Sequence, residues 1–272
     1  MQIQLLLLLL FFTSAALAAS ELDTWGLETE EDNGNIWSDY AEAKPDIYPD
    51  GWIVSKLAKF EGNETQLRSS NGALLRWVSS QQLKDLNQAF NKIEKVSETK
   101  ATLYLVQGNA PNASAGTREG ENGVLENIVL VNFSMLDMIG DNQSLWAALL
   151  GHELAHLKLS HGEKRAKRNL PISILKNIGK SVVSNPLGNA ASGLFFDSVG
   201  AAFSRTDETQ ADYMGVIWAI EAGYDPFGAV ELHKRMNDRG SKFNIPFLSN
   251  HPSGPERIKT LEALATRLSQ LP

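Results

Sequence analysis

The 272-residue sequence contains no cysteine. This absence excludes disulfides, thiolate metal ligands and a cysteine nucleophile, so any chemistry must depend on His, Asp, Glu, Ser or Lys. Positive charge is also scarce, since 25 Lys and Arg face 32 Asp and Glu and leave a net charge of −7. We therefore expect no nucleic acid among the partners, because phosphates are bound mainly through basic surface. The hydrophobic content of 43% is typical of a globular protein with a buried core.

The N-terminal apolar run extends from Leu5 to about Leu17 and places Ala16 and Ala18 as an A-x-A cleavage site. We predict that residues 1–18 are a signal peptide, because the run is shorter than the roughly 20 residues that span a bilayer. An exported protein is therefore expected, in the periplasm or secreted to the medium, with no stable membrane span after cleavage. The residues before the run include no Lys or Arg, and an uncleaved anchor is the alternative interpretation.

Residues 19–51 differ in composition from the rest of the chain. From Glu21 to Asp50 there are ten acidic residues and one lysine, interrupted by four Trp and Tyr residues. The excess of negative charge predicts a partly flexible segment, whereas the aromatic residues favour an extended strap that lies on the domain. The domain itself is predicted to comprise residues 52–272.

Apolar periodicity predicts an α+β domain that is mostly helical. Apolar residues between Gln81 and Val96 recur every three or four positions, which indicates a helix with one buried face. Residues 102–106 and 127–132 are β-rich runs, and the Asn-, Gly- and Pro-rich stretch 108–123 is predicted to be a loop. The sequence therefore predicts a small sheet with an edge near residues 127–132.

The second half of the chain is predicted to be helical. Asp141 and Asn142 are candidate N-caps of a buried helix that runs to about Ser160 and is apolar on all sides. Ser204 marks the start of another helix, which ends near Gly223. Further helices are expected at about 227–237 and 254–268. The Ser-, Ala- and Gly-rich stretch 171–204 is predicted to form two short helices that cover or line a cleft.

The motif that indicates chemistry is GHELAH at residues 151–156. On a helix, His152 and His156 lie about one turn apart on one face and can reach one tetrahedral zinc ion. Glu153 lies about 100° around the helix, where it can contact water at the metal without being a ligand. Each of these groups would cost on the order of a few kcal/mol if it were buried without a partner. A metal site is therefore favoured over a chance match on a structural helix.

A second pair of acidic residues suggests the third ligand. Glu208 and Asp212 are four residues apart in TDETQADYMG and share a predicted helix face with small residues. Small residues allow two helices to approach closely, so Glu208 could reach the metal opposite the two histidines. Asp212, one turn away, could then accept the N–H of a ligand histidine and fix its tautomer. The alternative for this pair is an ordinary solvated acidic face.

An ordered set of motifs resembles the zinc endopeptidase family that contains HtpX and the CAAX prenyl proteases. The set comprises HELAH, the E-x-x-x-D of Glu208 and Asp212, AGYDP at 222–226 and HPSGPERI at 251–258. The resemblance covers roughly Trp52 to Leu268 and points to soluble, exported bacterial members. The N-A-S-A sequence at residues 112–115 departs from the family's N-A-F-A, so the substrate-binding edge is expected to differ in shape.

The resemblance implies a gluzincin-type catalytic domain that binds one Zn²⁺ per chain. It implies that His152, His156 and Glu208 are the zinc ligands and that Glu153 is the general base. It also implies a small sheet whose edge strand binds the substrate. The membrane helices of HtpX-like members are missing, so a membrane-embedded substrate is not expected.

The other histidines and one arginine need separate interpretations. His161 is predicted to interact with the dipole at a helix C-terminus, and His233 is predicted to be a surface residue. His251 precedes a proline in a short loop, and in resembling proteins this loop approaches the metal. It could act there as a fourth, inhibitory ligand or as a donor to the developing oxyanion. Arg257 is predicted to be a structural partner of Asp212 or of another buried carboxylate.

The sequence thus predicts an endopeptidase that cleaves unfolded or misassembled envelope proteins, with the peptide bound as an added strand. The alternative is a chaperone-like module, without hydrolytic activity, that keeps zinc as a structural ion. A further hypothesis is a latent enzyme, in which His251 and residues 171–204 close the cleft until an envelope partner relieves the inhibition.

Overall fold

The computed structural model describes residues 52–53, 64–68, 74–108, 110–119, 124–169, 202–240 and 245–270. The predicted signal peptide, the acidic segment 19–51 and all but the last residues of the stretch 171–204 lie outside these ranges.

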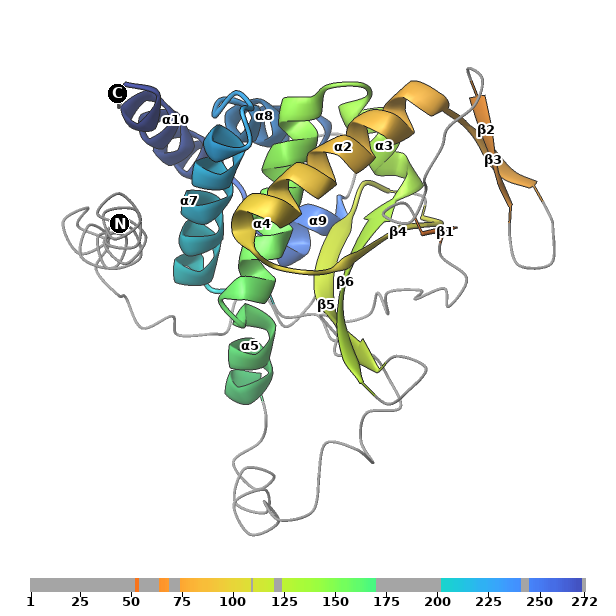
Figure 1. Ribbon diagram of the computed structural model, residues 1–272. Helices are drawn as coiled ribbons and strands as arrows, with labels where there is room; N and C mark the ends of the chain where they lie inside the picture. The colour runs from red at the N-terminus through yellow and green to blue at the C-terminus, as the bar shows by residue number, and fades with distance from the viewer. Residues whose placement is uncertain are drawn as a thin grey trace, which may run out of the picture. The chain divides into compact units, whose positions relative to one another are not determined.

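The described residues form strands, interrupted by one long helix after the third strand, and then a series of helices (Figure 1). The strands are β1 (Trp52–Ile53), β2 (Glu64–Arg68), β3 (Leu74–Ser79), β4 (Thr102–Val106), β5 (Ala113–Glu119) and β6 (Leu125–Asn132). The helices are α2 (Ser80–Ser97), α3 (Phe133–Ile139), α4 (Gln143–Lys158), α5 (His161–Asn169), α7 (Arg205–Glu221), α8 (Gly228–Gly240), α9 (Pro246–Asn250) and α10 (Pro255–Ser269). The predicted α+β class, mostly helical with a small sheet, is confirmed.

The main sheet has four strands in the order β1-β4-β6-β5, and β2 and β3 form a separate hairpin. β4 and β6 are parallel, while β5 runs antiparallel to β6 from the pair Ala113–Val131 to the pair Glu119–Leu125. β6 is therefore paired on both sides, and β5 is an edge strand. The prediction of an edge near residues 127–132 was wrong, as was the prediction of a loop throughout 108–123. The small and polar residues of β5 resemble a loop, and only pairing with β6 extends them.

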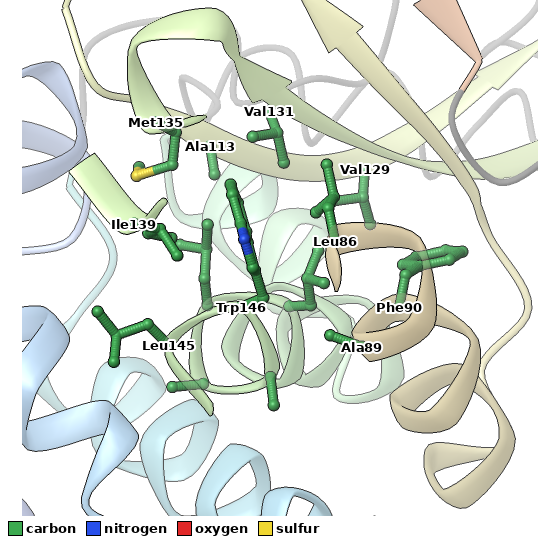
Figure 2. Packing of buried hydrophobic residues seen from close by; sticks show 14 of the residues in the cluster. Leu86, Ala89, Phe90, Ala113, Val129, Val131, Met135, Ile139, Leu145 and Trp146 are labelled. Atoms are coloured by element: carbon green, nitrogen blue, oxygen red, sulfur yellow. The ribbon is translucent and has the colours of Figure 1, made fainter. Parts of the chain in front are cut away.

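Helix α4 lies at the centre of the domain and packs against α2, α7, α8 and β5 (Figure 1). This central position agrees with the composition of α4, which has apolar residues on all sides. Every residue from Leu145 to His156 is buried. Trp146 projects from α4 toward the sheet and lies among Leu86 of α2, Ala113 of β5 and Val131 of β6 (Figure 2). Its indole Nε1 donates to the Gly140 carbonyl oxygen at 3.0 Å, so the ring is buried without an unsatisfied donor.

Helices α4 and α7 begin directly after Asn142 and Ser204, the residues predicted to cap them. The Asn142 side chain accepts hydrogen bonds from the backbone N–H groups of Ser144 and Leu145 and so begins α4. Ser204 and Asp207 form a reciprocal capping box at the start of α7. Gly223, which follows the end of α7, has a φ of 80°, the left-handed conformation that glycine adopts at little cost.

The helix predicted to run to about Ser160 is α4, and a separate helix, α5, follows it. α4 ends at Lys158, Ser160 has a φ of 54°, and α5 begins at His161. Among the described helices, none has both the length and the apolar character that crossing a membrane requires.

Candidate metal centre

The central helix α4 carries His152, Glu153 and His156 into the interior, and all three side chains are buried. The ring nitrogens Nε2 of His152 and His156 lie 3.0 Å apart, as expected for residues one turn apart on one face. Phe203 stacks on the His156 ring with centroids 3.9 Å apart. The two imidazoles are therefore held side by side in an apolar setting.

A close crossing of α4 and α7 brings Glu208 to the histidines. The helices meet at Gly151 and Gly215, where a Cβ atom on Gly215 would lie 2.9 Å from the backbone nitrogen of His152. No side chain fits at this crossing without a shift of the backbone. The carboxylate of Glu208 consequently lies 3.5 Å from His152 Nε2 and 3.4 Å from His156 Nε2.

His251 completes a cluster of four buried side chains. Its Nδ1 lies 3.1 Å from His152 Nε2 and 3.1 Å from Glu208 Oε1. One ligand atom from each of His152, His156, Glu208 and His251 lies within 4.8 Å of the others. Phe247 of α9 stacks on the His251 ring, with centroids 4.5 Å apart. The structure therefore brings His251 into the cluster as a potential fourth ligand, with its Nδ1 atom inward.

These four side chains fit a metal ion. A tetrahedral zinc ion with bonds of about 2.0–2.1 Å would separate its ligand atoms by about 3.3 Å. Five pairs in the cluster, with either oxygen of Glu208, are separated by 3.0–3.5 Å, and the remaining pair, His156 and His251, lies within 4.8 Å. Hydrogen bonds alone could not satisfy the cluster, because a neutral imidazole has one N–H and several lone pairs converge here. Three imidazole nitrogens and a carboxylate oxygen are also a donor set that suits zinc.

Asp212 and Arg257 support the cluster from one side. Asp212 Oδ1 lies 3.0 Å from His152 Nδ1, so an N–H there can donate to it and leave the lone pair of Nε2 facing the cluster. Arg257 donates to both Asp212 oxygens at 2.7 and 2.8 Å and to Glu208 Oε2 at 2.5 Å. Although burial alone would raise the pKa of Asp212, the charge of Arg257 and the hydrogen bond from His152 lower it. Asp212 therefore remains a carboxylate that can orient His152.

Glu153 lies beside the cluster but outside its donor set. Among the described residues its Oε1 has no hydrogen-bond partner, and it lies 3.7 Å from His251 Nε2, which has none there either. Burial raises the pKa of Glu153 to about 7. A buried carboxylate with this raised pKa can exchange a proton near neutral pH.

Two sequence predictions about histidines were wrong. His161 is the first residue of α5 and not the end of a helix, and it is buried. Its Nδ1 lies 3.1 Å from His156 Nδ1, a contact that the sequence did not reveal because it depends on the break after Lys158. His233 is also buried, with its Nδ1 2.8 Å from Ser253 Oγ, and burial lowers its pKa to about 3. Its helix α8 packs on α4, so this face is not at the surface.

Comparison with protein families agrees with this arrangement. Residues 79–265 match the family model of peptidase family M48, a range that includes all four side chains of the cluster. This chain belongs to peptidase family M48. The M48 match covers more than two thirds of the chain and begins at the last residue of β3.

The M48 relatives of this chain include three proteins named mitochondrial metalloendopeptidase OMA1. The Arabidopsis thaliana protein is 35% identical over 42% of this chain and 23% of its own length. The Schizosaccharomyces pombe protein is 28% identical over 62% of this chain and 48% of its own length. The Saccharomyces cerevisiae protein is 26% identical over 51% of this chain and 41% of its own length. The chain thus spans less than half the length of each of these relatives. All three are named OMA1, whereas the motifs in the sequence suggested the HtpX branch.

Proposed function

We propose that this chain is a zinc-dependent endopeptidase in which His152, His156 and Glu208 hold the ion and Glu153 is the general base. The observation that carries the proposal is the convergence of ligand atoms from four buried side chains within 4.8 Å, next to Glu153 Oε1, which has no hydrogen-bond partner among the described residues. Membership of peptidase family M48 and similarity to proteins named metalloendopeptidases support it.

A zinc ion bound at this site would polarise the scissile carbonyl and lower the pKa of water. Glu153 would accept the proton of the attacking water and deliver it to the nitrogen of the leaving amine. Burial, which raises the pKa of Glu153, makes its carboxylate a stronger base than an exposed one, and this suits proton uptake from water. Asp212 and Arg257 would act as positioning residues, since they hold His152 and Glu208 in place.

The peptide would bind along β5, the edge strand that packs against α4. Adding a strand to an open sheet edge uses main-chain hydrogen bonds and requires little side-chain specificity. Such binding suits unfolded protein substrates, and unfolded or misassembled envelope proteins are the class that we propose. The proposed compartment is the periplasm or the medium, and it rests on the apolar segment and A-x-A site at residues 1–18.

His251 would be a fourth ligand that keeps the enzyme latent. Its Nδ1 faces the cluster, and its Nε2 faces Glu153, so its ring occupies the space between the base and the other ligands. A ring in this position would exclude water from the site of attack. Substrate or an envelope partner would then have to favour the state in which His251 is withdrawn, by about 1.4 kcal/mol for each tenfold shift in population.

The same closed set of four donors favours a second candidate function. Structural zinc sites have four protein ligands and no open position, as a chaperone-like binding module without hydrolytic activity would require. Removal of His251 distinguishes the two functions. His251→Ala should increase casein cleavage at saturating zinc if His251 blocks an active site. A decrease would instead assign it to oxyanion stabilisation, and no cleavage by any variant would favour the binding module.

The decisive test of catalysis is Glu153→Gln. This variant should bind zinc as the parent chain does and lose several orders of magnitude in the rate of casein cleavage, because it lacks the general base. Glu231→Gln is a matched control, since Glu231 pairs with Arg235 on the exposed face of α8 and lies outside the cluster. Undiminished cleavage by Glu153→Gln would reject Glu153 as the base.

A further inference from the structure

His161 lies directly behind one of the proposed zinc ligands. Its ring is fully buried, with an exposed fraction of 0%. Its Nδ1 lies 3.1 Å from Nδ1 of His156, the nitrogen that points away from the cluster. Its Nε2 lies 3.0 Å from the side-chain oxygen of Gln210 on α7. His156, His161 and Gln210 thus form a continuous row of polar groups that ends at the cluster.

The protons in this row can be arranged in only one way that leaves His156 able to bind a metal. Nε2 of His156 faces the cluster and must carry a lone pair, so the single N–H of the neutral ring is on Nδ1. That N–H donates to Nδ1 of His161, which must then be unprotonated. The remaining N–H of His161 is on Nε2, where it donates to the Gln210 oxygen.

The opposite arrangement would be incompatible with a metal. If the Gln210 amide group donated to His161 Nε2, then His161 Nδ1 would carry the N–H and would donate to His156 Nδ1. The proton of His156 would consequently be on Nε2 and would point into the cluster. The acceptors that face His161 Nε2 therefore determine which nitrogen of His156 is free: the Gln210 oxygen is the nearer at 3.0 Å, and the Asp207 carboxylate lies at 3.7 Å.

The two ligand histidines of α4 consequently have different supports. His152 donates to the carboxylate of Asp212, which is itself paired with Arg257. His156 donates to the imidazole of His161, whose Nε2 faces the Gln210 amide oxygen at 3.0 Å and the Asp207 carboxylate at 3.7 Å. His152 and His156 are therefore oriented by different kinds of acceptor.

We propose that His161 and Gln210 are positioning residues that fix the tautomer and the orientation of His156 for metal binding. This inference rests on the proposed zinc site and assigns a further pair of residues to it. Residues that support metal ligands in this way typically contribute about 10- to 100-fold in metal affinity.

The test is the zinc dissociation constant of the full chain, measured by competition with a chromophoric chelator. His161→Met removes both nitrogens at similar volume and should weaken zinc binding by about 10- to 100-fold. His161→Gln keeps one acceptor and one donor and should restore most of the affinity. Gln210→Met should weaken binding, whereas Gln210→Glu, which keeps the acceptor, should not.

Thr209→Ala is the matched control for the Gln210 variants. Thr209 is the adjacent residue of α7, and its hydroxyl donates to the Arg205 carbonyl oxygen within the same helix. Its removal should leave zinc affinity unchanged. If His161 and Gln210 contribute only packing, His161→Gln should weaken zinc binding as much as His161→Met does. Gln210→Glu should likewise weaken it as much as Gln210→Met.

The outcomes separate this inference from the proposed function. If the parent chain binds no zinc, the proposed function fails. If the parent binds zinc and His152→Ala does not, but His161→Met and Gln210→Met bind as tightly as the parent, the positioning role is refuted. Should His161→Met fail to fold, the two Gln210 variants still decide the question.

Discussion

Replacing Gly215 with alanine should weaken the protein and its metal site together. The added Cβ would lie 2.9 Å from the His152 backbone nitrogen and 3.1 Å from the Gly151 carbonyl carbon. Ordinary contact begins at 3.4 Å, so α7 must move away from α4 by about half an ångström. Both neighbours are backbone atoms of the buried helix α4. Unlike a side chain, they cannot relieve the contact by changing rotamer.

The magnitude follows from two opposing effects. Alanine in place of glycine stabilises a helix by about 1 kcal/mol, whereas overpacking a closely packed contact costs about 1–3 kcal/mol. We expect a net loss of about 1 kcal/mol in the free energy of unfolding. The same shift would move Glu208 relative to the two histidines by more than the roughly 0.2 Å that metal–ligand distances tolerate. Zinc affinity should therefore fall by about tenfold or more.

Two measurements separate these effects. Urea unfolding in the presence of a chelator, followed by tryptophan fluorescence, gives the stability of the metal-free chain. Chelator competition gives the zinc dissociation constant. Gly162→Ala is the control, because a Cβ on this exposed glycine of α5 would meet no atom of the described residues within 4 Å. It should leave both quantities unchanged or raise stability slightly. If Gly215→Ala matches the parent in both assays, the glycine crossing does not position Glu208.

Three further predictions concern the ligands, a helix cap and the N-terminus. His152→Ala and Glu208→Ala should each abolish the binding of one zinc ion per chain, measured by elemental analysis after dialysis; full occupancy in both variants would reject the ligand assignment. Ser204→Ala removes the acceptor for the Asp207 N–H and should lower the free energy of unfolding by about 1 kcal/mol. An unchanged urea midpoint would show that the capping box contributes nothing. Intact-mass measurement of exported material should find a mature chain that begins near Ala19, and a full-length chain extractable only with detergent would contradict signal cleavage.

The parts of the site that lie within one helix could be predicted from the sequence. His152, Glu153 and His156 are close in sequence, and helical geometry alone places the two rings together. Glu208 and Asp212 could be paired for the same reason, and the small residues around them indicated a close helix crossing. Local patterns contain this information because a helix repeats every 3.6 residues.

Contacts that depend on irregular backbone could not be predicted. His161 reaches His156 because Ser160 adopts a left-handed conformation and a new helix starts after it, and a serine at this position gives no such signal. β5 was mistaken for a loop because its small and polar residues become a strand only when β6 supplies the partner. The burial of His233 likewise depends on the packing of α8 on α4, which no property of its own helix specifies.

The direct packing of α4 on α7 has a consequence for the integrity of the chain. His152 and His156 precede residues 170–201 in the sequence, while Glu208 and His251 follow them. A single peptide bond cleaved in that interval would divide the donors between two polypeptides. The two polypeptides would nevertheless share the helix crossing at Gly151 and Gly215, and a bound ion would act as a cross-link between them. We therefore expect a chain cut there to behave as a split protein, whose halves stay associated and keep an intact centre until the ion is removed.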